Sequence, residues 1–158
     1  MGTLGAARRP SITPSLMRSF VLVFLQAALM VAITVPFDAL AWNAVASVLV
    51  AVALALGVWT LTANRPGNFN VRPEPKADGV LVTGGPYRHV RHPMYLALLV
   101  AMAGFCIGYG TPWRWVALAA LAGVIVIKAG IEERAMTARH PGYATYAQRT
   151  KRLIPFVW

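Results

Sequence analysis

The sequence carries very little negative charge. Only five of its 158 side chains are acidic, against 15 lysines and arginines, and 13% of the residues are charged. Ordinary soluble domains contain about 25% charged residues, which disfavours a water-soluble globule. Intrinsic disorder is excluded because it requires abundant charge and few apolar residues. The single cysteine, Cys106, permits neither an intramolecular disulfide nor a cysteine-based metal cluster. What remains is a chain that is 58% hydrophobic and has the length of one domain.

Four apolar runs account for most of this hydrophobicity. They cover residues 19–35, 44–63, 94–110 and 115–127. The first two lack charge and approach the roughly 20 residues that cross a bilayer as a helix. The fourth extends over 113–131 if Arg114 and Lys128 direct their charged ends to the bilayer surfaces. We therefore predict an all-α fold, a polytopic membrane bundle of about four transmembrane helices. A signal peptide over the first run is disfavoured because its cleavage site, 44–46, falls inside the second run.

Lysine and arginine are distributed unevenly around these runs. Fourteen of the 15 lie before the first run, between the second and third, or from Lys128 onward, and only Arg114 lies in the other connections. Because basic flanks stay in the cytoplasm, we predict that both termini and the long connection 64–92 are cytoplasmic. The membrane that we expect is a bacterial inner membrane. Basic flanks also suit anionic membrane lipids, so the net charge of +10 requires no nucleic acid as partner.

The long connection ends in a basic and aromatic cluster. Residues 84–86 predict a turn, and Pro93 suits the first position of the next helix, which keeps His92 out of helical geometry. Arg91 and His92 then lie beside the amides of a helix N-terminus, a setting that binds carboxylate or phosphate. A membrane-interface belt, with Arg91 on lipid phosphate and Tyr95 at headgroup depth, explains the same residues equally well. A metal site on the three histidines is disfavoured because no Cys, Asp or Glu completes a ligand set.

Ionisable side chains follow the fourth run. Lys128, Glu132 and Glu133 lie at its cytoplasmic end, on a helix that extends to about Arg139. Such groups at the edge of a membrane helix are functional candidates. Glu132 is the stronger candidate because Lys128 lies one turn before it on the same face. Glu133 has the alternative of a solvated surface residue.

The tail from His140 onward is basic and aromatic. Its periodicity predicts a short amphipathic helix on the membrane surface. We favour this surface role for Lys151 and Arg152.

Several motifs then follow one another in a fixed order. They are residues 81–87 (LVTGGPY), 91–95 (RHPMY), Glu132-Glu133, and Tyr143-x-x-Tyr146 with a tail ending near Ile154-Pro155. In this order and spacing they resemble the isoprenylcysteine carboxyl methyltransferase family and its bacterial relatives, over about residues 64–158. The resemblance implies a single integral membrane methyltransferase domain over 1–158. Its N-terminal transmembrane hairpin is 1–63, and its cofactor-binding and catalytic part is 64–158.

The same resemblance implies a donor, an acceptor class and site residues. The donor is S-adenosylmethionine, with S-adenosylhomocysteine as product, and the acceptor is a lipophilic or lipidated molecule in the membrane. The implied cofactor-binding residues are Gly79, Val80, Leu81, Val82, Tyr87, Arg91, His92, Pro93, Met94, Tyr95 and Glu132. The implied catalytic residues are Lys128 and Glu132. Lys128 stands where the family has a substrate-contacting arginine, and an ammonium does not reproduce a guanidinium fork.

Elementary chemistry agrees with this donor and leaves other points open. His92 and Arg91 suit its carboxylate, and Glu132 suits its ammonium or ribose. The acceptor is a prenylated-cysteine carboxylate, a phospholipid amine or a small hydrophobic thiol or acid. The competing functions are an NADPH-dependent enzyme similar to sterol reductases and a non-catalytic lipid-binding protein. Gly104 and Gly108 are suited to close helix packing, within this chain or with a second copy. The methyltransferase hypothesis predicts that the bundle has a cytoplasmic cofactor pocket on which Glu132 and His92 converge.

Overall fold

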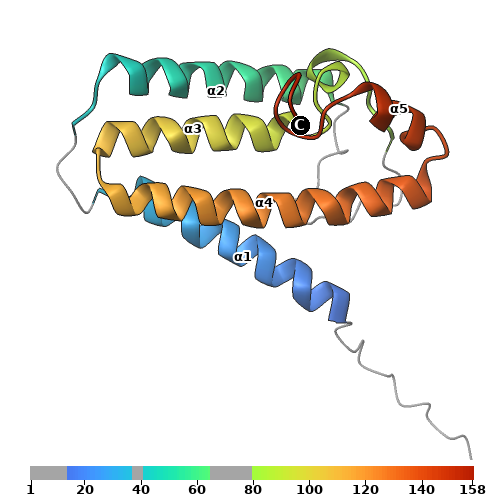
Figure 1. The fold of residues 1–158 in the computed structure, drawn as a ribbon, viewed down its shortest axis with the longest axis horizontal. Coiled ribbons are helices and arrows are strands. Elements are labelled where there is room, and N and C mark those ends of the chain that lie inside the picture. The colour runs from blue at the N-terminus through green and yellow to red at the C-terminus, as the bar shows by residue number, and fades with distance from the viewer. Residues whose placement is uncertain (1–13, 37–40, 65–79) are drawn as a thin grey trace, which may run out of the picture.

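The described residues of the computed structural model, 14–36, 41–64 and 80–158, form a bundle of long helices (Figure 1). The long helices are α1 (Pro14–Thr34), α2 (Ala44–Ala63), α3 (Pro93–Tyr109) and α4 (Pro112–Arg139). Two short helices, η1 (Gly85–Arg88) and α5 (Tyr143–Arg149), complete them. Successive long helices run in opposite directions, and α1 crosses α4 at an angle (Figure 1).

Three of these helices, α1, α2 and α4, are long and apolar enough to cross a membrane. The fourth, α3, is apolar but has 17 residues, about 25 Å of helix. The predicted all-α membrane bundle is confirmed, and so is the extension of the last long helix to Arg139. Gly79 and most of the long connection lie outside the described residues.

The helix boundaries follow from local sequence. The side chain of Asn43 accepts a hydrogen bond from the Ala46 amide at 3.0 Å and caps α2. Pro93 begins α3, as predicted, and His92 before it has a non-helical backbone (φ −123°, ψ 61°). Gly110 ends α3 in the left-handed conformation, with φ of 68°.

Small residues let α3 approach α2 closely. A Cβ atom on Gly104 would lie 2.9 Å from Val50 Cγ2 and 3.2 Å from the Ala46 carbonyl oxygen of α2. A Cβ atom on Gly108 would collide with the indole ring of Trp42. Gly104 therefore packs against α2 of the same chain, and Gly108 against Trp42 just before α2.

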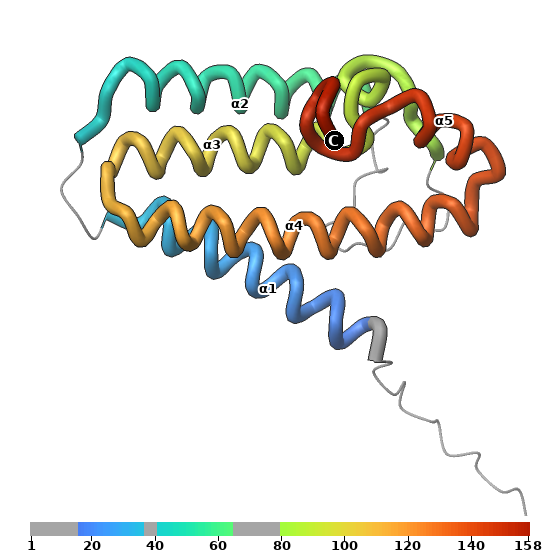
Figure 2. Tube along the Cα trace, viewed as in Figure 1, coloured from blue at the N-terminus to red at the C-terminus, as the bar shows by residue number. Residues whose placement is uncertain are grey.

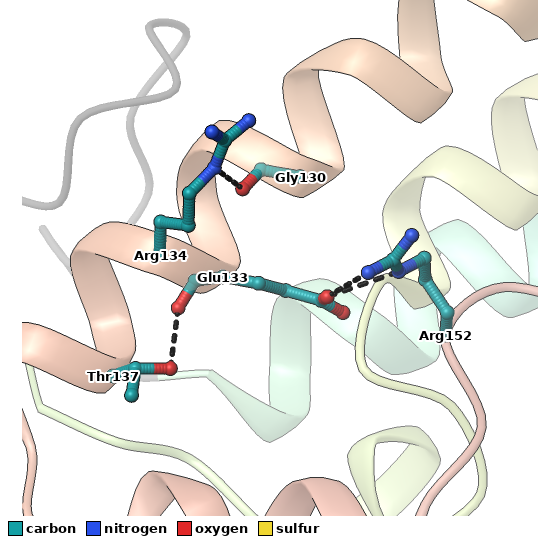
Figure 3. Close-up of a pocket in the computed structure, with 5 residues that line it drawn as sticks. All are labelled: Gly130, Glu133, Arg134, Thr137 and Arg152. Atoms are coloured by element: carbon teal, nitrogen blue, oxygen red, sulfur yellow. Dashed lines mark hydrogen bonds and ion pairs between the residues drawn. The ribbon is translucent and has the colours of Figure 1, made fainter.

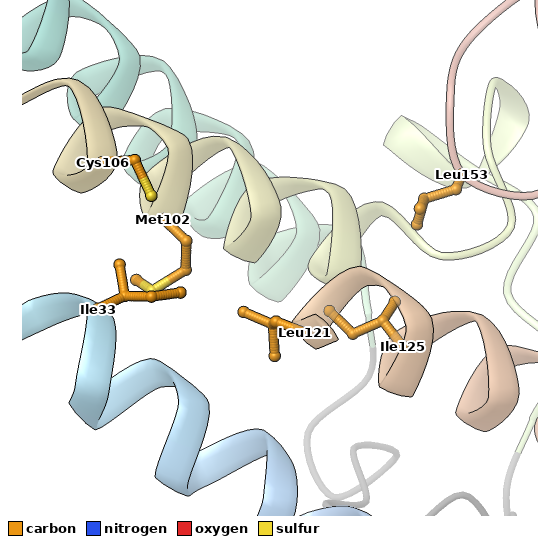
Figure 4. Packing of buried hydrophobic residues seen from close by; sticks show 6 residues of the cluster. All are labelled: Ile33, Met102, Cys106, Leu121, Ile125 and Leu153. Atoms are coloured by element: carbon orange, nitrogen blue, oxygen red, sulfur yellow. The ribbon is translucent and has the colours of Figure 1, made fainter. Parts of the chain in front are cut away.

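The buried apolar cluster joins three helices and the tail (Figure 4). Its members are Ile33 of α1, Met102 and Cys106 of α3, Leu121 and Ile125 of α4, and Leu153. Each of these side chains is at most 5% exposed. Because Leu153 belongs to the cluster, the segment after α5 is anchored to the bundle core.

Arg114 binds other parts of the chain, whereas a longer fourth run is expected only if this side chain extends outward. Its side chain is fully buried and lies 3.8 Å, measured from Cζ, from the centroid of the Tyr109 ring. It donates hydrogen bonds to the carbonyl oxygens of Ala32, Ile33 and Val35 at the end of α1, at 3.3 Å to Ala32 and 3.0 Å to Val35. The last carbonyls of a helix have no partner within it, and inside a bilayer no water replaces one. Arg114 therefore satisfies the end of α1 and joins it to α4.

We expect Arg114→Met to lower the free energy of unfolding by about 2–4 kcal/mol, since it leaves carbonyl oxygens without a donor in an apolar setting. Denaturant unfolding of the purified protein in micelles measures this change. Arg149→Met on the exposed surface of α5 is the control, with an expected change within about 0.5 kcal/mol. Equal losses in the two variants would contradict the assigned role.

Candidate functional site

The site begins where the chain before α3 pairs with the chain after α5. Val90 and Lys151 form a parallel bridge, the Arg91 amide donates to the Lys151 carbonyl at 2.8 Å, and the His92 amide donates to the Arg152 carbonyl at 3.1 Å. Figure 2 shows the tail turning back toward this segment. The tail is helical only to Arg149, because Thr150 adopts an extended conformation (φ −124°, ψ 152°). The prediction of a simple surface helix is therefore wrong for Lys151 and Arg152.

Glu132 and His92 are in contact, as the sequence predicts. Glu132 Oε2 lies 3.3 Å from His92 Nδ1, and Glu132 Oε1 accepts a hydrogen bond from the Tyr95 hydroxyl. The Tyr95 ring stacks on the His92 ring, with centroids 5.5 Å apart and an interplanar angle of 19°. The end of α4 and the first turn of α3 thus meet through three polar side chains.

Glu133 is the most heavily engaged side chain of the site. Its Oε1 accepts a hydrogen bond from Arg91 Nε at 2.7 Å and lies 3.3 Å from His92 Nε2. Its Oε2 accepts from Arg152 Nε at 2.9 Å and Nη2 at 2.5 Å. The Glu133 side chain is 13% exposed. The alternative of a solvated surface residue is therefore wrong, and we call Glu133, Arg91, His92 and Arg152 the Glu133 cluster.

His92 lies between two carboxylates. Its Nδ1 faces Glu132 and its Nε2 faces Glu133, so both ring nitrogens have acceptors. An imidazole can donate from both nitrogens only when it is protonated. Burial lowers the pKa of His92, but the hydrogen bonds and charges of the two glutamates outweigh it, and the net effect is a pKa above the ordinary 6.5. The site therefore favours the imidazolium form.

Arg91 also secures the tail. Its Nη1 donates to the carbonyl oxygens of Ala147 at 2.9 Å and Thr150 at 2.5 Å, while its Nε binds Glu133. The guanidinium thus spans from α4 to the end of α5. Its predicted role in cofactor binding stays a prediction, since these contacts are structural.

Tyr87 links η1 to two other elements. Its hydroxyl accepts from Asn64 Nδ2 at 3.2 Å, and its carbonyl accepts from the Tyr146 hydroxyl at 2.7 Å. Burial raises the pKa of Tyr146 to about 12, which keeps this donor protonated. Gly85, at the start of η1, has a φ of 58°, and a Cβ atom there would lie 2.6 Å from Ala63 Cβ of α2. Only glycine fits both constraints.

The remaining predicted cofactor residues lie on both sides of η1. Val80 is exposed, and Leu81 and Val82 are partly buried, in the segment before η1. Pro93 is buried and Met94 is partly buried in the first turn of α3. The hydrogen bonds that join Glu132, His92 and Tyr95 do not include any of these five, so their role stays a prediction.

Lys128 is buried, whereas a longer fourth run is expected if its charged end reaches the bilayer surface. Its side chain is 1% exposed, and its Nζ donates to Gln26 Oε1 of α1 at 2.6 Å. The same Nζ lies 5.4 Å from the centroid of the Tyr95 ring. Sequence reasoning missed Gln26, although an amide in an otherwise apolar run is a detectable signal. The polar site therefore includes α1.

An open cleft of about 510 Å³ lies beside the Glu133 cluster. Figure 3 shows its lining residues, Gly130, Glu133, Arg134, Thr137 and Arg152. Arg134 Nε donates to the Gly130 carbonyl at 3.1 Å, and Thr137 Oγ1 donates to the Glu133 carbonyl at 2.8 Å. The volume is in the range of small-molecule sites.

The comparison with family models gives one match. A model described as phospholipid methyltransferase matches residues 41–142. The match includes α2, α3 and α4, with His92, Lys128 and both glutamates, and ends before α5. No curated protein matches the chain.

We expect the stability contributed by His92 to depend on pH. Because its folded pKa is raised, its contribution is fully present below pH 6.5 and is lost as the pH rises through the folded value. The groups facing it are Glu132 and Glu133 of α4, Arg91 beside it, Arg152 of the tail and Tyr95 of α3. Thermal unfolding at a series of pH values from below 6.5 upward measures the effect. The difference between wild type and His92→Gln should shrink as the pH rises; a constant difference would contradict the imidazolium.

Proposed function

The chain belongs to the phospholipid methyltransferase family and is a membrane methyltransferase, and from this premise we propose that it transfers a methyl group from S-adenosylmethionine to a lipophilic acceptor. The observation that carries the proposal is the contact between His92, before α3, and Glu132, on α4, at 3.3 Å. It brings an anion-binding helix start and a carboxylate to one place. The distribution of lysine and arginine supports a cytoplasmic position for this place, and the membrane in the proposal is a bacterial inner membrane.

The chemistry of the side chains fits this donor. Its carboxylate suits the start of α3, where the His92 side chain makes no capping hydrogen bond to the backbone. Its ammonium suits Glu132, whose side chain is 24% exposed and is the more accessible of the two glutamates. Leu81, Val82 and Met94 offer apolar surface for its adenine, and Tyr87 offers an aromatic face for a cation. Gly79 and Val80 belong to the same proposed set.

The residues of the chain mainly orient the reactants, and the donor itself supplies the reactive methyl group and the leaving group. The donor, when bound, supplies an electrophilic methyl group on a sulfonium that leaves as a neutral thioether. In-line alignment is then the main requirement, and a fixed site lowers its entropic cost. Both ring nitrogens of His92 face carboxylates, so neither is free to take a proton from an acceptor. The site therefore favours acceptors that arrive as anions, such as carboxylates or thiolates, over amines that must first lose a proton.

Lys128 is the proposed acceptor-side residue. It is buried in the bundle beside Tyr95 and is held by Gln26 of α1, between two helices that are long and apolar enough to cross a membrane. An ammonium in this position attracts an anionic group on the acceptor. This agrees with the preference for an acceptor that needs no base.

Donor binding tests the proposal. In lipid nanodiscs, S-adenosylhomocysteine should bind the wild type, and Glu132→Gln and His92→Gln should each weaken binding by about tenfold or more, or about 1.4 kcal/mol. Isothermal titration calorimetry measures the affinities. Gln148→Ala, on the exposed face of α5, is the control and should match the wild type. If intact wild-type protein does not bind S-adenosylhomocysteine, the proposed function is wrong.

Substitution of Lys128 tests whether this residue acts on the acceptor or on the donor. Lys128→Gln should lower the rate of methyl transfer by at least about tenfold, while the affinity for S-adenosylhomocysteine changes less than about threefold. Mass spectrometry of a membrane extract incubated with labelled donor identifies the acceptor and supplies the assay. Lys128→Arg should retain more activity, since it keeps the positive charge. Equal losses of donor affinity and rate in Lys128→Gln would place Lys128 on the donor side instead.

A further inference from the structure

Residues 154–158 form a turn, here called the C-terminal turn, whose apolar side chains are exposed. Phe156 is 88% exposed, Val157 72%, Ile154 47% and Trp158 43%. The amides of Leu153 and Ile154 donate to the Trp158 carbonyl at 2.9 and 2.7 Å and close the turn. Phe156 has a φ of 65°, an unfavourable conformation for a bulky residue. Packing within the described chain does not explain an ordered turn that presents these side chains outward.

Tryptophans indicate the depth of the C-terminal turn. Tryptophan is enriched at membrane–water interfaces, and the five in this chain lie at the two ends of the bundle. The Trp59 ring, near the end of α2, lies 6.5 Å from the His89 ring, and the His89 carbonyl accepts from the Lys151 amide. These contacts place Trp158 at the same end as Trp59. The opposite end holds Trp42, Trp113 and Trp115.

The exposed charged side chains on the segments next to the C-terminal turn are positive. Arg149 of α5 and Lys151 precede it in the chain and are exposed, and so is Arg88 of η1, next to His89, whose carbonyl accepts from the Lys151 amide. Among the described residues the acidic side chains are Glu132 and Glu133, and both are engaged in the site. Apolar side chains flanked by basic ones are suited to an anionic lipid surface, which attracts each exposed lysine or arginine. The position of Trp158 at the same end of the bundle as Trp59 favours a lipid surface over a protein partner.

Arg152 connects the C-terminal turn to the site. Its Cζ lies 5.1 Å from the centroid of the Trp158 ring. Its guanidinium binds Glu133 Oε2, and its carbonyl accepts from the His92 amide at 3.1 Å. A displacement of the turn therefore moves a side chain that holds Glu133 and a backbone that holds His92.

We propose that the C-terminal turn inserts into the headgroup region of an anionic lipid surface, and that this insertion keeps Arg152 on the Glu133 cluster and the donor site in order. The insertion is argued from the exposed apolar residues of the turn, from the positions of Trp59 and Trp158 at one end of the bundle, and from the exposed basic side chains. The effect on the donor site rests on the proposed function.

Depth measurements test the insertion. A spin label on Val157→Cys, in full-length protein in nanodiscs containing phosphatidylglycerol, should collide more with oxygen than with a water-soluble nickel complex. The buried native Cys106 is protected from labelling. A label on Gln148→Cys, at an exposed polar position of α5, is the control and should show the reverse order. A label at 157 that behaves like the control overturns the proposal, and so does one shielded from both reagents, because protein would then cover the turn.

Phe156→Asp tests the coupling. Phe156 is 88% exposed, so no internal packing is lost, and aspartate tolerates the left-handed conformation. The variant should move a label at 157 into water and weaken S-adenosylhomocysteine binding in nanodiscs by about fivefold or more. Phe156→Leu should match the wild type in both measurements.

The two measurements separate the possible failures. Unchanged affinity in Phe156→Asp, with a displaced turn, overturns the coupling and leaves the insertion. A wild type that binds no S-adenosylhomocysteine overturns the proposed function and the coupling with it, while the label at 157 still decides the insertion.

Discussion

The structure of the site depends on one carboxylate, Glu133, which is bound by Arg91, His92 and Arg152. These partners come from the segment before α3 and from the tail, separated from Glu133 by 42, 41 and 19 positions. A carboxylate that is 13% exposed is stable only when its hydrogen-bonding capacity is met by charged donors. Removing a partner leaves part of the hydrogen-bonding capacity of Glu133 unmet, and the start of α3, the Glu133 region of α4 and the tail are therefore held together as a unit.

The same rule explains the polar side chains within the bundle. Arg114 is fully buried yet binds the carbonyl oxygens that end α1, and Lys128 is buried yet binds Gln26 of α1. In an apolar medium, an unsatisfied polar group costs more than ordering the side chain that satisfies it. Arg114 therefore joins α4 to the end of α1, and Lys128 joins α4 to the middle of α1 at Gln26. These two links fix the position of α1 without close apolar packing along its whole length.

Sequence periodicity predicted the helices but not their cross-links. The apolar runs, Pro93 at the start of α3 and the contact of Glu132 with His92 were all accessible, because they follow from local signals and from a recognisable order of motifs. The partners of Arg114 and Glu133 were not, since they depend on how distant elements pack. The tail shows the limit clearly: its composition suits a surface helix, but the pairing of Val90 with Lys151 overrides that preference after Arg149. Local propensity is a weak guide where tertiary hydrogen bonds compete with it.

The two adjacent glutamates of α4 have different hydrogen-bonding and ionic partners. A helix turns by about 100° per residue, so Glu132 and Glu133 point in different directions and meet different partners. Glu133 faces two guanidinium groups and His92, and both of its carboxylate oxygens are bound by partners within the fold. Glu132 faces the shared His92 and the neutral hydroxyl of Tyr95, and its side chain is more exposed. Of the two carboxylates, Glu132 therefore retains the greater capacity to interact with a cation that enters the site, while Glu133 fixes the imidazolium against which Glu132 is oriented.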